Sequence, residues 1–247
     1  SQLFYAQRLY QFPLGVFGIS LATAIFPVLS SDAARKDFTS LCRTVSRGLR
    51  CSVFISLPAT VGLLMVGEPL VGMIFERGEF SSADTIGTTF TLAFYVLGLG
   101  GYIAQQVLTR VFYSLQESDV PAKSAVIAVL VNVCLNLTLV WFLGAGGLAA
   151  STAICSYLQV GILATILRRR FGPEIRAGMR RAVLETIGAT ICMEAVLLAV
   201  LHALRYQGAA MQLLVAVPTA GGAYLLVAWL CRVEMLSLLF GGHRPKG

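Results

Sequence analysis

The chemistry that stands out in this chain is a cation on a helix face that is otherwise almost bare. An α-helix would place on one face the five positions spaced by three, four, three and four residues: Arg8, Gln11, Gly15, Gly18 and Ala22. A guanidinium donates two parallel hydrogen bonds to a phosphate or a carboxylate. Small residues beside it leave room for a ligand, for water or for a second helix. The stripe from Arg8 to Gly18 is therefore a candidate for binding an anionic substrate.

The residues alone leave two interpretations of Arg8. A cation inside a bilayer is costly unless it faces a water-filled cavity or the interior of a bundle, which favours an anion-binding cavity. However, Arg8 lies only about 10 Å along the helix from Ser1. Its side chain could therefore extend to the outer membrane surface instead.

A second polar pair lies in the middle of an apolar stretch. Asn132 and Asn136 are one helical turn apart in VLVNVCLNLTLV, so they share a helix face. Amides at this depth usually hydrogen-bond to a neighbouring helix. Their carbonyl oxygens could also contribute to a sodium site. Because no carboxylate accompanies them, helix association is the favoured interpretation.

The elements that must position these residues are membrane-spanning helices. Of the 247 residues 57% are hydrophobic and 13% are charged, and the mean hydropathy is +0.78, whereas soluble domains average about 25% charged. A spanning helix needs roughly 20 apolar residues. We predict an all-α integral membrane protein with seven spans, at about 3–29, 51–75, 86–114, 122–143, 147–168, 182–204 and 209–231. Prolines inside three of these spans (Pro13, Pro58 and Pro218) each remove a backbone donor and predict a kink.

The link between the first two spans has a different pattern. In residues 30–50 apolar positions recur at helical spacing, with basic residues between them. This pattern is typical of an amphipathic helix that lies at the membrane surface. We predict such a helix near 32–48, within a first domain of residues 1–170. The last two spans and the tail form a second region, 171–247.

The distribution of charge predicts the topology. Taking the links alternately, one side holds only Arg77 and Arg205, and the other holds fifteen basic residues. The rich side should be cytoplasmic, which places the end of the first helix with Arg8 outside and the C-terminus inside. The net charge of +7 is thus a topology signal, and we expect no nucleic-acid partner.

The sequence offers no arrangement for covalent catalysis. The six cysteines are scattered singly without a CxxC pair, and His202 and His243 have no nucleophile or metal-ligand pattern around them. We therefore expect a protein that is not an enzyme. The chain starts without a methionine a few residues before a spanning helix, so we expect a fragment of a longer protein.

Three segments carry a resemblance to a known family. RLYQFPLGVFGISLATAIFPVLS, LPATVGLLMVGEPLVGMIFERGEFSSADT and VLTRVFYSLQESDVPAKSAVI occur in this order with helices between them. They resemble the MurJ (MviN) lipid II flippase family of the multidrug/oligosaccharidyl-lipid/polysaccharide exporter superfamily. The resemblance covers nearly the whole chain and is strongest from residue 5 to about 170. It identifies the chain with helices eight to fourteen of a fourteen-helix transporter, namely its second lobe and two extra helices.

The resemblance implies a function in peptidoglycan biosynthesis. The family moves the undecaprenyl-diphosphate-linked precursor, lipid II, across the bacterial inner membrane by alternating access. Arg8 matches the arginine of helix eight that belongs to the cationic central cavity. The partners would be lipid II, membrane lipids and the N-terminal lobe of the same protein. The last two helices correspond to those that form a groove for the lipid tail.

The family also implies a sodium site for some members. Asn132, Asn136 and Thr152 fall where two of its helices would supply ligands, but Asn136 stands where the family site has an aspartate. Two alternatives to a lipid II flippase remain open. One is another exporter of the superfamily, for polysaccharide-linked lipids or drugs, and the other is a non-transporting membrane scaffold.

Overall fold

The chain folds into a bundle of long helices. The computed structural model describes residues 2–78 and 80–231, and within these residues seven helical segments are long and apolar enough to cross a membrane. This confirms the predicted all-α membrane fold. The elements are α1 (Gln2–Pro13), η1 (Leu14–Ile19), α2 (Ser20–Ala34), α3 (Phe38–Phe75), α4 (Ser82–Leu97), α5 (Leu99–Ser114), α6 (Asp119–Leu143), α7 (Ala145–Phe171), η2 (Pro173–Arg176), α8 (Met179–Ala203) and α9 (Ala209–Leu230). The elements α1, η1 and α2 form one continuous span, and α4 and α5 form another.

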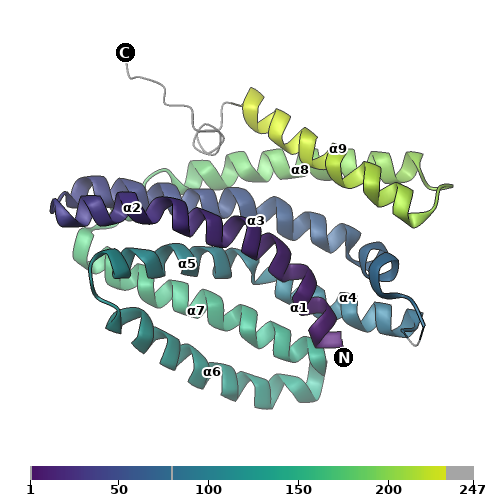
Figure 1. Ribbon diagram of the computed structural model, residues 1–247, viewed down its shortest axis with the longest axis horizontal. Coiled ribbons are helices and arrows are strands. Elements are labelled where there is room, and N and C mark those ends of the chain that lie inside the picture. The colour runs from purple at the N-terminus through teal and green to yellow at the C-terminus, as the bar shows by residue number, and fades with distance from the viewer. Residues whose placement is uncertain (1, 79, 232–247) are drawn as a thin grey trace.

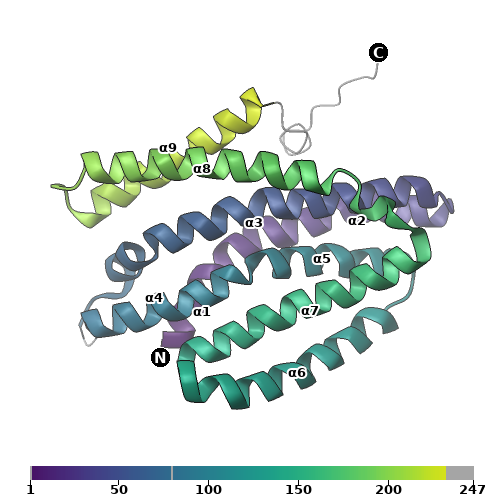
Figure 2. The ribbon, with the colours of Figure 1, turned by 180° about the vertical axis from the view of Figure 1, so that it is seen from behind.

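The helices lie side by side in a clear order (Figures 1 and 2). The α8–α9 hairpin packs along α3 at one edge, and α6 packs along α7 at the opposite edge, with α1, α2 and α5 between them. The outer side of α6 is strongly apolar and exposed at Leu130, Leu137, Trp141 and Phe142. In a bilayer this side of α6 would face lipid, because hydrocarbon is the environment that suits such a surface.

The predicted surface helix near 32–48 does not form a separate element. Its first residues end α2, and the rest begin α3, which runs without interruption for 38 residues from an N-cap at Asp37. The apolar face of this stretch, including Leu41 and Val45, is buried against α2, α5 and α7. The amphipathic pattern is therefore satisfied by protein packing, whereas the prediction had assigned it to the membrane surface.

A break at Gly98 divides the third span into α4 and α5. Two carbonyls next to the break accept hydrogen bonds from neighbouring helices: Thr60 Oγ1 donates to the Val96 oxygen at 3.1 Å, and the Tyr157 hydroxyl donates to the Leu97 oxygen at 2.8 Å. In lipid, each backbone group without a partner would cost several kcal/mol. The two side chains therefore make the break tolerable at this depth.

A side-chain hydrogen bond also compensates for the helical bond that is lost at the proline inside α3. Pro58 has no N–H, so the carbonyl oxygen of Phe54 loses its helical partner. The Tyr224 hydroxyl of α9 donates to this oxygen at 2.6 Å, and its ring lies 5.0 Å from the Phe54 ring. The extra C-terminal hairpin is thus joined to α3 at the point where α3 lacks its own hydrogen bond.

This contact predicts a coupled pair of substitutions. Tyr224→Phe keeps the packing but leaves the Phe54 oxygen without a donor, so we expect a loss of about 1–3 kcal/mol in stability. Pro58→Ala restores the helical donor, and in that background Tyr224→Phe should cost much less. Thermal unfolding of the four proteins in detergent measures the coupling. Equal costs of Tyr224→Phe in both backgrounds would contradict this explanation.

Candidate substrate-binding face

The stripe predicted from the sequence divides into two parts in the structure. Arg8 and Gln11 are exposed and Gly15 is half-buried, with open space where a Cβ would lie. Gly18 and Ala22 are buried. A Cβ at Gly18 would lie 3.1 Å from Cγ1 of Ile103, so this glycine permits close contact with α5. The structure therefore places Gly18 in helix packing, away from the exposed face that holds the other predicted residues.

The π-helix η1 is the physical reason for this division. A π-helix closes its hydrogen bonds over five residues, so it adds about one residue per turn relative to an α-helix. Positions after η1 are shifted by one, and the face that begins with Arg8 and Gly15 continues at Thr23 and Ser30. The spacings along it are seven, eight and seven, with the eight spanning η1. Thr23 is exposed and Ser30 is half-buried, as this continuation requires.

Arg8 lies against an aromatic ring at the N-terminal end of this face. Its guanidinium carbon lies 5.1 Å from the centroid of the Phe4 ring, one turn earlier in α1. Among the described carboxylates none forms an ion pair with Arg8. A cation–π contact orients a guanidinium but leaves its five N–H donors available. The arrangement is therefore suited to receiving an anion.

A second arginine, which is not among the site residues predicted from the sequence, lies beside this face. Arg110 lies in the predicted span 86–114, and the structure places it on α5, half-buried, with its guanidinium carbon 5.6 Å from the centroid of the Phe26 ring of α2. An arginine inside an apolar span was a sufficient signal to single it out. Only the basic residues of the links enter the topology prediction, so Arg110 is not among the residues predicted above.

The amide pair forms a polar cluster between α6 and α7. Asn136 Nδ2 donates to Asn132 Oδ1 at 2.8 Å, and the Ser151 hydroxyl donates to Asn136 Oδ1. The third predicted residue, Thr152, does not join the pair, because its hydroxyl donates to the Leu148 oxygen of its own helix. Both amide oxygens accept from protein donors, and the described residues contain no carboxylate in the cluster. These residues do not fit a sodium ion, and they favour the association of the two helices.

This cluster predicts how stability depends on salt and on the amides. Asn136→Leu removes both hydrogen bonds between these side chains and leaves Ser151 with only its bond to the Leu148 oxygen of its own helix, so we expect a loss of about 1 kcal/mol. Replacing all three together, with Leu, Leu and Ala, should cost less than the single change. Thermal unfolding should be the same in sodium and potassium chloride. A stabilisation specific to sodium that Asn136→Leu abolishes would contradict the packing interpretation.

A separate apolar groove lies between α2 and α3. Its volume is about 460 Å³, and its lining includes Leu21, Ile25, Cys51 and Ile55, with Arg47 as its charged member. The Leu21 and Ile55 side chains also pack on the cluster that α3 forms with α8 and α9. The groove is thus next to the C-terminal hairpin, and its lining includes neither Arg8 nor Gln11.

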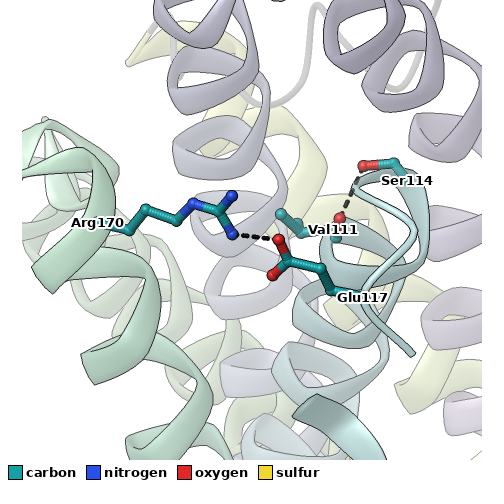
Figure 3. A network of polar contacts seen from close by, with 4 residues as sticks. All are labelled: Val111, Ser114, Glu117 and Arg170. Atoms are coloured by element: carbon teal, nitrogen blue, oxygen red, sulfur yellow. Dashed lines mark hydrogen bonds and ion pairs between the residues drawn. The ribbon is translucent and has the colours of Figure 1, made fainter. Parts of the chain in front are cut away.

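At the predicted cytoplasmic end, an ion pair joins the α5–α6 link to the end of α7 (Figure 3). Arg170, at the end of α7, donates to the Glu117 carboxylate in the α5–α6 link at 2.5 Å. The backbone N–H of Glu117 donates to the Phe112 oxygen of α5. At the end of α5 the Ser114 hydroxyl donates to the Val111 oxygen of its own helix (Figure 3). Both charged side chains are partly exposed, and a pair of this kind contributes at most about 1 kcal/mol. Its role is to hold the link beside α7.

Comparison with known proteins gives a consistent result. The family described as lipid II flippase MurJ matches residues 1–219. A probable lipid II flippase MurJ from Vibrio cholerae is 35% identical over 163 residues, which cover 66% of this chain and 31% of that protein. The one from Bdellovibrio bacteriovorus is 27% identical over 249 residues, which cover 99% of this chain and 47% of that protein.

Solved structures show the same fold. A lipid II flippase MurJ in an inward closed conformation matches with a TM-score of 0.73 and 23% identity, over 96% of this chain and 48% of that one. A transporter of the multidrug resistance MATE family, in the MOP superfamily, matches with a TM-score of 0.50 and 18% identity, over 96% of this chain and 55% of that one. The chain spans less than half the length of the curated relatives described above. Because the family match covers most of its residues, the chain belongs to the lipid II flippase MurJ family.

Proposed function

We propose that this chain is the second lobe, with two extra helices, of a lipid II flippase of the bacterial inner membrane. The observation that carries the proposal is Arg8, an arginine without an ion-pair partner among the described residues, on the exposed face of a spanning helix in a chain of this family. The substrate is the undecaprenyl-diphosphate-linked peptidoglycan precursor. The reaction is a crossing from the inner to the outer leaflet by alternating access, and no covalent bond changes.

The physical need for the face follows from the charge of the substrate. A diphosphate cannot cross about 30 Å of hydrocarbon unaided, because each desolvated charge costs several kcal/mol. Arg8 would replace part of the lost hydration with charge-assisted hydrogen bonds. The exposed face of α1, η1 and α2 would meet a first lobe of the same protein to enclose a cavity, while the apolar tail remains beside α3 and the α8–α9 hairpin. In this arrangement the C-terminus is cytoplasmic, as the basic links predict.

The test is to express the gene that encodes this chain in a bacterium whose own flippase is depleted. We expect growth to be restored, together with cleavage of lipid II by an enzyme added outside the cells. Growth without the return of cleavable lipid II on the outer leaflet would contradict the proposal. So would a failure to support growth when the protein is present in the membrane at a normal level. Export of a cationic dye in its place would favour the drug-exporter alternative.

A further inference from the structure

We propose that Glu194 of α8 is a proton-binding site, and that its proton holds the α8–α9 hairpin against α3. The neutral carboxyl is stable in the packed interface, whereas the carboxylate requires water and therefore a separation of the hairpin from α3. The inference goes beyond the proposed function, because it stands on contacts within this chain and holds for any transported substrate.

Glu194 lies deep in a membrane span. It is 15 residues after Met179, where α8 begins, and nine residues before Ala203, where α8 ends. These spacings correspond to about 23 Å and 14 Å along the helix. The Oε1 atom of Glu194 lies 4.0 Å from the position that a Cβ would take at Gly62 of α3. The carboxyl group therefore lies against α3 at a residue that has no side chain.

Neither carboxyl oxygen of Glu194 has a hydrogen-bond partner among the described residues, although both are buried. Two other buried polar side chains inside the spans do have partners: Gln159 donates to Ser124 Oγ at 3.2 Å, and Tyr224 donates to the Phe54 oxygen at 2.6 Å. A buried carboxylate without a partner is far more costly than a buried neutral carboxyl, so such a group takes up a proton. The packed hairpin thus selects the protonated form.

The helices around Glu194 supply no described cation to stabilise a carboxylate. The helix α8 packs on α3 and α9. The nearest charged or titratable residues along these three helices are Arg50, Cys51 and Glu68 of α3, Glu185, Cys192 and His202 of α8, and Tyr224 of α9. The basic residues among them are Arg50, twelve residues from Gly62, and His202, eight residues from Glu194, or about 18 Å and 12 Å along a helix. Neither donates a hydrogen bond to the carboxyl group.

The hydrogen bond between Tyr224 and Phe54 gives the hairpin a pivot. Phe54 precedes Gly62 by eight residues, or about 12 Å along α3. One layer of water between Glu194 and α3 requires about 3 Å, the length of an O–H···O bond. Tyr224 is 15 residues, or about 22 Å, from the start of α9 at Ala209. The same rotation would therefore move the α8–α9 link by about 5–6 Å.

The first measurement is infrared difference spectroscopy of the purified full-length protein in nanodiscs. A neutral carboxyl has a C=O stretching band that a carboxylate lacks. We expect Glu194→Gln to remove such a band at mildly acidic pH, and we expect the band of the unmodified protein to disappear as the pH is raised. The matched control is Glu185→Gln on the same helix. Glu185 pairs with Arg181 at 2.6 Å, so its carboxylate is already stabilised and its loss should leave the band in place.

The second measurement is the distance between spin labels at Tyr206 in the α8–α9 link and at Ile86 in α4, which are both exposed. The accessible native cysteines are first replaced by serine. We expect one distance while the carboxyl band is present, and a shift of about 5–6 Å once a higher pH has removed the band. Glu194→Gln should keep the first distance at every pH, and Glu185→Gln should follow the unmodified protein.

Each outcome decides one part of the inference. If Glu194→Gln removes no carboxyl band, or if the band persists to the highest pH at which the protein is folded, the proton site is wrong. If the band titrates without a change in distance, or if Glu194→Gln still shows the change, the coupling to the hairpin is wrong. Thermal unfolding checks that each variant is folded. None of these measurements depends on lipid II export, so their failure leaves the flippase assignment standing.

Discussion

Arg8→Ala in the gene that encodes this chain is expected to abolish the growth of a flippase-depleted strain. The change removes the cation at the N-terminal end of the polar face, where the diphosphate would lose its replacement for water. The loss of two charge-assisted hydrogen bonds corresponds to at least a ten- to hundredfold fall in lipid II export. The measurement is the amount of lipid II that an enzyme added outside the cells can cleave, at equal protein level in the membrane.

Arg205→Ala is the matched control for this change. Arg205 is also exposed, lies on the predicted outer side and stacks on an aromatic ring, with its guanidinium carbon 4.7 Å from the centroid of the Tyr206 ring. It is outside the polar face, so its loss should leave growth normal. Arg8→Lys keeps the charge but not the planar fork, and should retain part of the export. Normal growth of the Arg8→Ala strain would mean that this side chain only reaches the membrane surface.

Gly101→Val should strongly reduce the amount of folded protein. A Cβ at Gly101 would lie 3.1 Å from the Ser156 Cβ and 3.2 Å from the backbone nitrogen of Tyr157, so α5 and α7 would have to separate. Valine adds two further methyl groups at this contact. Overpacking of this kind costs about 3 kcal/mol or more, because the obstacle includes backbone that cannot change rotamer. Thermal unfolding in detergent and the yield of monodisperse protein measure the effect.

Gly161→Val provides the corresponding control on α7. Gly161 is exposed, and nothing lies within 4 Å of the position where its Cβ would be. The substitution should therefore leave both the yield and the unfolding temperature nearly unchanged. If the two variants unfold alike, then close packing of α5 on α7 does not limit the stability of the bundle.

Hydropathy was sufficient to find the spans, because their length and composition are dictated by the bilayer itself. It could not find where a helix changes its winding. Nothing in LGVFGI distinguishes a π-helix from an α-helix, yet η1 moves Gly18 and Ala22 into buried positions and brings Thr23 to the open face. A stripe drawn from α-helical spacing alone was therefore correct only up to Gly15.

Two further features could not be predicted without knowing which residues each side chain contacts. The apolar face at Leu41 and Val45 was recognised, but periodicity does not say whether lipid or protein covers it, and here protein does. Asn132 and Asn136 were placed on one face, and their hydrogen bond agrees with that. The sequence could not show that Ser151, and not its neighbour Thr152, completes the cluster.

Because α3 is a long continuous helix, a small tilt of this lobe would move the ends of α3 by a large distance. The 31 residues from Phe38 to Glu68 extend over about 46 Å, and α3 bends only near its C-terminal end (Figure 1). Rotation of such a rod by about 10° around its midpoint displaces each tip by about 4 Å. A spectroscopic label at the Phe38 tip would therefore report rocking of the lobe far more sensitively than one at the membrane centre.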